Sequence, residues 1–212
     1  MTVRAKICGL SDPAAVTAAL RGGAAAVGFV FYSPSPRAVT PDQAAALAEP
    51  CDRVLKTGLF VDPGDHEIDR VLAAVALDLI QLHGHEAPDR VAEIKHRFGR
   101  PVMKALKISG PEDIAQAARY PAADRLLFDA KPLAATALPG GNGVPFDWRL
   151  LAGRRWPRPW MLSGGLDAAN VARAVALTGA TWVDVSSGVE DAPGQKSPAR
   201  IGAFLDAVRD LA

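Results

Sequence analysis

The sequence predicts an α/β fold in which eight strand–helix units close into a (β/α)8 barrel. Short apolar runs recur along the chain, and most are almost continuously apolar, as strands buried on both faces of a parallel sheet are. Alanine-rich segments with helical spacing lie between them, so we expect a helix after each of the eight strands. The strand starts follow one another at steps of 22 to 34 residues, most of them near 24, which favours a closed barrel. An open doubly wound sheet is the alternative, because the sequence does not show the order of the strands.

The predicted strands are too short for typical helices and span residues 3–8, 26–31, 54–61, 77–82, 101–106, 125–129, 159–162 and 181–185. Helix starts carry a capping residue or an early proline. The first helix begins at Ser11-Asp12-Pro13 and is closed by Gly22-Gly23. Later starts lie at Pro41, Pro63-Gly64-Asp65, Pro88-Asp89, Pro111-Glu112-Asp113, Asp167 and Pro198. The chain contains no linker or low-complexity segment, so we expect residues 1–212 to form one TIM barrel domain.

The composition excludes several classes of protein. With 49% hydrophobic and 22% charged residues, the 212-residue chain is not a disordered protein. Its net charge of +1 disfavours a nucleic-acid partner. Two cysteines, Cys8 and Cys51, exclude a disulfide scaffold and a four-thiol zinc site. No uncharged apolar run approaches the roughly 20 residues of a membrane span, and the start lacks the apolar core of a signal peptide. We therefore expect a cytoplasmic protein without a membrane partner.

Alanine is unusually frequent. The chain has 40 alanines beside 19 glycines and 17 prolines. Alanine favours helix, whereas glycine and proline end it. Many short helices that pack closely on the strands would explain this mixture.

Two reactive side chains stand at predicted strand ends, where the active sites of such barrels are built. Cys8 ends strand one, where a thiol can act as a nucleophile or base, although a buried cysteine is also simply a small hydrophobe. Asp129 ends strand six, where burial would suit it to general-acid work, although it could instead cap the next turn.

Arg37 and His83 are the further candidates in the early loops. Arg37 follows two prolines after strand two, and a guanidinium held there suits a carboxylate or phosphate; the alternative is a solvated surface arginine. His83 ends strand four in the run His83-Gly84-His85-Glu86. This spacing matches no strong metal motif, so we expect no metal, with His83 contacting a ligand and His85 exposed.

Glycine and serine form turns after the last two strands. Ser163-Gly164-Gly165 follows strand seven and Ser186-Ser187-Gly188 follows strand eight. Such turns expose backbone N–H groups and form the usual phosphate site of this barrel. The run Gly194-Gln195-Lys196-Ser197 is not a P-loop, because it lacks the upstream glycine. The ligand predicted from the residues alone is therefore a phosphosugar.

The longest step between strands contains an extended loop, residues 130–147, with glycines at 140, 141 and 143. We expect this loop on the active-site face, either as a mobile lid or as a plain surface loop.

These motifs resemble the phosphoribosylanthranilate isomerase family of tryptophan biosynthesis over nearly the whole chain. The matching segments are residues 6–9 (Lys-Ile-Cys-Gly), 28–37, 58–61, 81–84, Asp129 with the glycines of 140–143, 162–166, 184–190 and 193–196. The resemblance implies an Amadori rearrangement that needs no cofactor. N-(5-phosphoribosyl)anthranilate becomes 1-(2-carboxyphenylamino)-1-deoxyribulose 5-phosphate. Family members are commonly monomeric, and the sequence leaves a monomer or a homodimer open.

The resemblance also implies roles for residues. Asp129 matches the general acid and Cys8 the general base. Arg37 would hold the anthranilate carboxylate, and His83 would contact the substrate. The phosphate would bind to backbone groups of Gly141, Gly164, Gly165, Ser187 and Gly188. One departure is Asn142, where the family more often has Thr or Ser, which puts the behaviour of the loop in question.

Two other functions remain as alternatives. A related phosphosugar isomerase of histidine biosynthesis would use the same barrel, but such relatives usually have an aspartate at the position of Cys8. A non-catalytic sensor of phosphate ligands would keep the phosphate turns without using the thiol and carboxylate.

Overall fold

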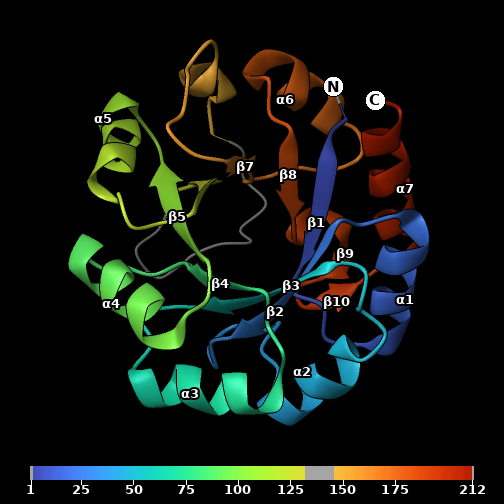
Figure 1. The fold of residues 1–212 in the computed structure, drawn as a ribbon. Helices are drawn as coiled ribbons and strands as arrows, with labels where there is room; N and C mark the ends of the chain where they lie inside the picture. Colours follow the sequence, from blue (N-terminus) through green and yellow to red (C-terminus); the bar gives the residue numbers. More distant parts are fainter. Residues whose placement is uncertain (1, 132–145, 212) are drawn as a thin grey trace.

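The computed structural model describes residues 2–131 and 146–211, and it contains a closed barrel of eight parallel strands (Figure 1). The strands are β1 (Arg4–Cys8), β2 (Ala26–Phe31), β3 (Leu55–Phe60), β4 (Leu79–Leu82), β5 (Val102–Ile108), β6 (Arg125–Ala130), β7 (Trp160–Leu162) and β8 (Trp182–Val185). Each pairs with the next in sequence, and β1 pairs in parallel with β8, which closes the ring. The predicted (β/α)8 fold is confirmed, and the open sheet is excluded.

Helices surround the barrel, and their ends follow the predicted signals (Figure 1). They are α1 (Pro13–Gly22), α2 (Pro41–Ala48), α3 (Asp65–Ala74), α4 (Pro88–Phe98), α5 (Pro111–Ala115), α6 (Val171–Thr178) and α7 (Pro198–Arg209). Asp12 caps α1 by accepting a 2.9 Å hydrogen bond from the Ala15 N–H. Gly23 ends α1 at φ 85°, a left-handed conformation that favours glycine. Ala15 and Ala19 of this helix are fully buried, which is the close packing that the alanine content predicted.

Three details of the prediction are wrong. In the described part of the chain, β6 is followed by a short 3₁₀ helix, Trp148–Leu151, and not by an α-helix. Helix α6 begins at Val171, because the Asp167 carboxylate instead accepts from the N–H groups of Ala169 and Asn170 and forms a turn. After β8, the chain makes an unpredicted antiparallel hairpin of β9 (Glu190–Ala192) and β10 (Gln195–Lys196). Most of the predicted loop 130–147, Gly141 and Asn142 included, lies outside the described residues.

Alternation along the strands divides the interior into two layers. In β1, Ile7 points outward and belongs to the large core between the barrel and its helices. Residues on the inner faces of the other strands, such as Met103 and Leu127, fill the barrel itself. Lys6 and Cys8 are two residues apart on β1 and share its inner face. The barrel interior therefore combines an apolar layer with buried charged side chains such as Lys6 and Asp184.

No helix in the described residues has both the length and the apolar character needed to cross a bilayer.

Candidate active site

Parallel strands place all eight carboxyl ends on one face of the barrel, and the described candidate residues gather there. Cys8 is the last residue of β1, Asp129 is near the end of β6, and His83 directly follows β4. All three residues are almost completely buried, with exposed fractions of 4–5%. A buried acid, imidazole and thiol around one barrel mouth are groups that exchange protons.

Cys8 lies in a tight and mostly apolar setting beside Val30 and Leu59. Burial raises the pKa of the Cys8 thiol, because the thiolate loses hydration. The nearby Lys6 ammonium opposes this effect and lowers the pKa. Lys6 Nζ itself lies 2.7 Å from Asp184 Oδ1 on β8. The thiol therefore stands beside a buried ion pair.

Asp129 belongs to a chain of hydrogen bonds that runs through His83. His83 Nε2 is 3.1 Å from Asp129 Oδ2, and His83 Nδ1 is 2.9 Å from Gln81 Nε2. With the Gln81 amide donating to Nδ1, the imidazole donates from Nε2 to the aspartate. Turning that amide over would reverse the direction, so that a protonated Asp129 donates to Nε2. The pair can thus hold Asp129 in either protonation state.

Hydrogen bonds and an ion pair made by Glu86 hold the loop after β4 in place and so fix the position of His83. Glu86 Oε1 accepts from the N–H groups of Asp62 and Gly84, and Glu86 Oε2 lies 2.6 Å from Lys104 Nζ. Burial alone would raise the pKa of Glu86, but Lys104 lowers it below its usual value. Glu86 is therefore a structural anion, whereas His85 in the same loop is exposed, as predicted.

Arg37 is held by the unpredicted hairpin. Its Nε and Nη2 lie 2.7 and 2.8 Å from the two carboxylate oxygens of Glu190. Lys196 Nζ lies 2.6 Å from Glu190 Oε1. Burial would raise the pKa of Glu190, but these two cations lower it. With only 5% of its surface exposed, Arg37 is not the solvated surface arginine that the residues alone left open.

The two glycine turns lie against each other. Gly164 and Gly165 both have positive φ, at 89° and 66°. A Cβ on Gly188 would strike the carbonyl oxygen of Leu166, so only glycine lets the turns after β7 and β8 approach. Gly164 and Gly165 lie outside helices and strands, and within the described residues their backbone N–H groups donate no hydrogen bond. Unsatisfied N–H groups gathered in one place suit a phosphate.

Comparison with known proteins identifies the family of the chain. The family model of N-(5'-phosphoribosyl)anthranilate isomerase matches residues 5–207. The chain belongs to this isomerase family. It is 58% identical over 208 residues to the N-(5'-phosphoribosyl)anthranilate isomerase of Rhodospirillum centenum, covering 97% of each chain. It is 57% identical over 212 residues to that of Paramagnetospirillum magneticum, covering 99% of this chain and 98% of the relative.

Solved structures of phosphoribosylanthranilate isomerases have the same fold. The Thermotoga maritima enzyme superposes with a TM-score of 0.87 at 34% identity, covering 99% of this chain and all of the other. A phosphoribosylanthranilate isomerase in complex with reduced 1-(o-carboxyphenylamino)-1-deoxyribulose 5-phosphate has a TM-score of 0.86, with the same identity and coverage.

The sequence motifs assign no role to four buried charged residues close to these candidates. Lys6, Asp184 and Glu190 occur only within the matching segments 6–9 and 184–190. Lys196 occurs in the false P-loop and in the matching segment 193–196, in both places without a role. An available signal was a lysine in the middle of an otherwise apolar strand, since such a charge needs a buried partner.

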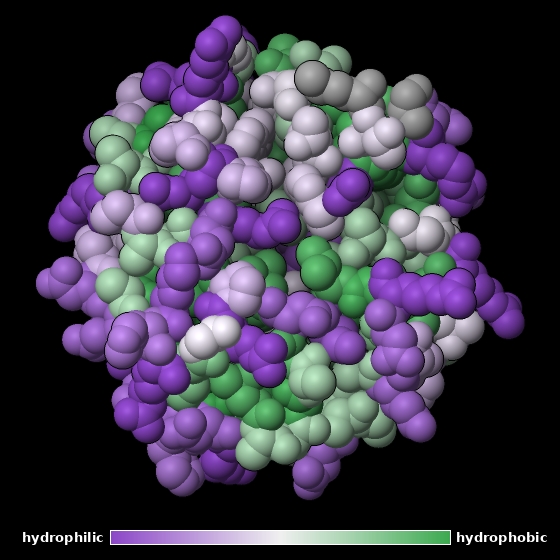
Figure 2. All heavy atoms as spheres, in the orientation of Figure 1, coloured by the Kyte–Doolittle hydropathy of each residue, from purple (hydrophilic) through white to green (hydrophobic). Residues whose placement is uncertain are grey.

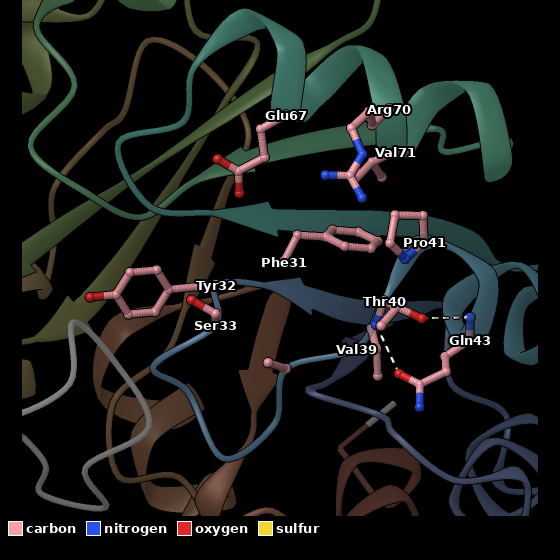
Figure 3. A pocket seen from close by; sticks show the side chains of 11 residues that line it. Phe31, Tyr32, Ser33, Val39, Thr40, Pro41, Gln43, Glu67, Arg70 and Val71 are labelled. Carbon is pink, nitrogen blue, oxygen red and sulfur yellow. Dashed lines mark hydrogen bonds between the residues drawn. The ribbon is translucent and has the colours of Figure 1, made fainter.

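A metal centre and an outer cavity are the two other kinds of site to consider. Within residues 2–131 and 146–211, no three His, Cys, Asp or Glu side chains are grouped to hold a metal ion. A cavity of about 300 Å³ lies outside the barrel, between the end of β2, α2 and α3 (Figure 3). Phe31, Val39 and Val71 line it, and its Thr40 and Gln43 already satisfy each other. It contains none of the predicted site residues of the isomerase.

Proposed function

We propose that this chain converts N-(5-phosphoribosyl)anthranilate into 1-(2-carboxyphenylamino)-1-deoxyribulose 5-phosphate in tryptophan biosynthesis. The observation that carries the proposal is a buried thiol and a buried carboxylate at the mouth of one barrel, with the N–H groups of the Gly164–Gly165 turn nearby. Strands β1 and β6, which bear Cys8 and Asp129, are separated by β7 and β8 in the ring. The two groups therefore approach a bound sugar from different sides, as an acid and a base must.

Asp129 acts first, as the general acid. It gives a proton to the ring oxygen of the furanose, and the bond from that oxygen to C1 breaks. The nitrogen lone pair forms a C1–N double bond, which gives an open-chain Schiff base. The hydrogen bond between Asp129 and His83 fixes the orientation of the carboxyl group.

Cys8 acts second, as the general base. Its thiolate takes the C2 proton, and the C2–H electrons move to the carbon–nitrogen unit to give an enolamine. The enolamine becomes the ketone when C1 gains a proton and the C2 hydroxyl loses one. Substrate and product therefore have the same atoms, and the reaction is an isomerisation. Arg37 binds the anthranilate carboxylate, and the N–H groups of the two glycine turns bind the phosphate.

The test is turnover by single-residue variants. A coupled spectroscopic assay follows the loss of phosphoribosylanthranilate. Cys8→Ala and Asp129→Asn should each lower kcat by a factor of about 10² to 10⁴, the usual contribution of acid–base groups. Cys51→Ala is the matched control, because this thiol is also buried but its Sγ–H donates to the Leu47 carbonyl at 3.5 Å in α2. Its kcat should be unchanged.

Two outcomes of these assays would contradict the proposal and favour an alternative function. Turnover of a histidine-pathway phosphosugar, without turnover of phosphoribosylanthranilate, would indicate the related isomerase. Tight binding of the phosphosugar without turnover by the wild-type chain would indicate a sensor.

We further propose that residues 1–212 fold as one domain. Pairing of β1 with β8 and packing of α1 against α7 support this, because they join the two ends of the chain. A single cooperative unfolding transition is expected in urea, with the same midpoint by fluorescence and circular dichroism. Two separate midpoints would contradict it.

We also propose that the chain is a monomer in the cytoplasm. Among the described residues, Leu177 is the one large hydrophobic side chain that is exposed. Figure 2 shows hydrophilic residues over much of the outer rim. Both cysteines are free thiols, which suits a reducing compartment. Light scattering of the purified protein distinguishes the monomer from a homodimer, and cell fractionation tests the location.

A further inference from the structure

Lys6 is completely buried inside the barrel, on the same face of β1 as Cys8. Its side chain has no exposed surface, and its Nζ lies 2.7 Å from Asp184 Oδ1. Burying an ammonium group is costly unless a counter-charge compensates for the lost hydration. An apolar residue at position 6 would avoid this cost. The mechanism above gives the Lys6–Asp184 pair no role.

The position of Gly28 on the neighbouring strand β2 shows how close Lys6 is to the thiol. A Cβ at this residue would lie 2.9 Å from Cys8 Sγ and 3.2 Å from Lys6 Nζ. The sulfur and the ammonium thus border the same small space. That space is available because residue 28 has no side chain.

Without a positive charge nearby, a buried thiol is seldom ionised and is therefore a poor general base. Burial raises the pKa of Cys8, and the charged groups that act on it are Lys6, Asp184 and Lys196. Lys6 lowers the pKa most, Asp184 raises it, and Lys196 lowers it less. The lysine on the same strand is thus the main electrostatic support of the thiolate.

We propose that Lys6 is a positioning residue of the isomerase, whose ammonium, held in place by Asp184, stabilises the thiolate of Cys8. The inference rests on the proposed role of Cys8 as the base. While Cys8 is ionised, Lys6 lies between two anions. When Cys8 takes the C2 proton, Lys6 keeps its own proton and pairs with Asp184 alone. Lys6 does not exchange a proton with the substrate.

The charge of Lys6 persists through this cycle. Burial pushes its pKa down, but attraction to Asp184 and Cys8 and the hydrogen bond to Asp184 push it up further, so the pKa of Lys6 lies above its usual value. A lysine that remains protonated throughout acts as a fixed charge, which is the form of catalytic support that needs no reorganisation.

The experiment is a titration of the Cys8 thiolate by its far-ultraviolet absorbance. Each protein is measured against its own Cys8→Ala counterpart, so that Cys51 and the tyrosines cancel. Lys6→Met should shift the titration to higher pH by at least about one unit, which lowers the thiolate fraction and kcat at neutral pH by about tenfold. The loss of kcat should recover as the pH is raised. Lys6→Arg keeps the charge and should stay near the wild-type titration.

Controls separate this effect from a loss of stability. Lys104→Met removes another buried lysine with its own partner, Glu86, and should destabilise the fold without moving the thiolate titration. If Lys6→Met does not fold, Lys6→Met/Asp184→Asn removes both charges and should still give a smaller alkaline shift. Gly28→Ala keeps both charges but pushes the ammonium and sulfur apart, and it should also give an alkaline shift.

The inference is overturned if the folded variants titrate as the wild type does, or if kcat falls equally at every pH. That result is distinct from failure of the proposed function. If Cys8→Ala keeps its turnover, Cys8 is not the base, whatever the titration shows. If Cys8→Ala is inactive and the Lys6 variants titrate normally, only the role of Lys6 is wrong.

Discussion

Replacing Glu190 by glutamine should both destabilise the fold and weaken substrate binding, because this one carboxylate holds two cations. It makes two hydrogen bonds with Arg37, at 2.7 and 2.8 Å, and one ion pair with Lys196, at 2.6 Å. Glutamine has the same shape but no charge. The variant therefore leaves a buried guanidinium and a buried ammonium facing a neutral amide.

The size of the effect follows from burial. The side chains of Glu190 and Arg37 are only 4% and 6% exposed. Removing one partner of a buried pair costs ~3–5 kcal/mol of unfolding free energy. For a chain of this length, that is a fall in Tm of about 6–20 °C. KM should rise by about tenfold as Arg37 loses its fixed position, whereas kcat should change less, because Cys8 and Asp129 are unaltered.

Urea unfolding and steady-state kinetics of wild type and Glu190→Gln measure both effects. Since the pKa of Glu190 is lowered in the folded state, its contribution is present above the unfolded pKa of about 4.3 and is lost as the pH falls through the folded pKa. The gap in stability between the two proteins should therefore narrow in acid.

The matched control is Glu93→Gln. Glu93 is 66% exposed and lies 3.4 Å from Arg90, so its loss should cost less than about 0.5 kcal/mol. A cost below about 1 kcal/mol for Glu190→Gln, together with an unchanged KM, would refute the reasoning.

Three further predictions follow from the site. Gly188→Ala should lower Tm and raise KM, because its Cβ would strike the carbonyl oxygen of Leu166 and separate the phosphate turns; thermal melts and KM measurements check this. His83→Asn should lower kcat by about tenfold or more with little change in KM, since it removes the hydrogen bond to Asp129; an equal rise in KM would instead indicate a substrate contact. For the wild type, kcat/KM should rise with pH from neutral into the alkaline range, because burial raises the pKa of the Cys8 thiol; a flat profile would argue against a thiolate base.

Much of the fold follows from local patterns in the sequence. The predicted strand 26–31 coincides with β2, and the other strands begin within two residues of their predicted starts. Asp12 and Gly23 end α1 as expected from capping chemistry. These signals succeed because burial on both faces and the ends of helices depend on neighbouring residues. The hairpin after β8 gave no such signal, because its strands are only three and two residues long.

The candidate site, like the fold, is only partly predictable from local sequence. Position at a strand end was enough to make Cys8 and Asp129 candidates, since all the parallel strands end on one face. Only the tertiary structure decided what surrounds them. The pairs Lys6–Asp184 and Arg37–Glu190 join residues 178 and 153 positions apart. Whether a lysine in an apolar strand meets a carboxylate depends on closure of the barrel, and a linear pattern does not encode that distance.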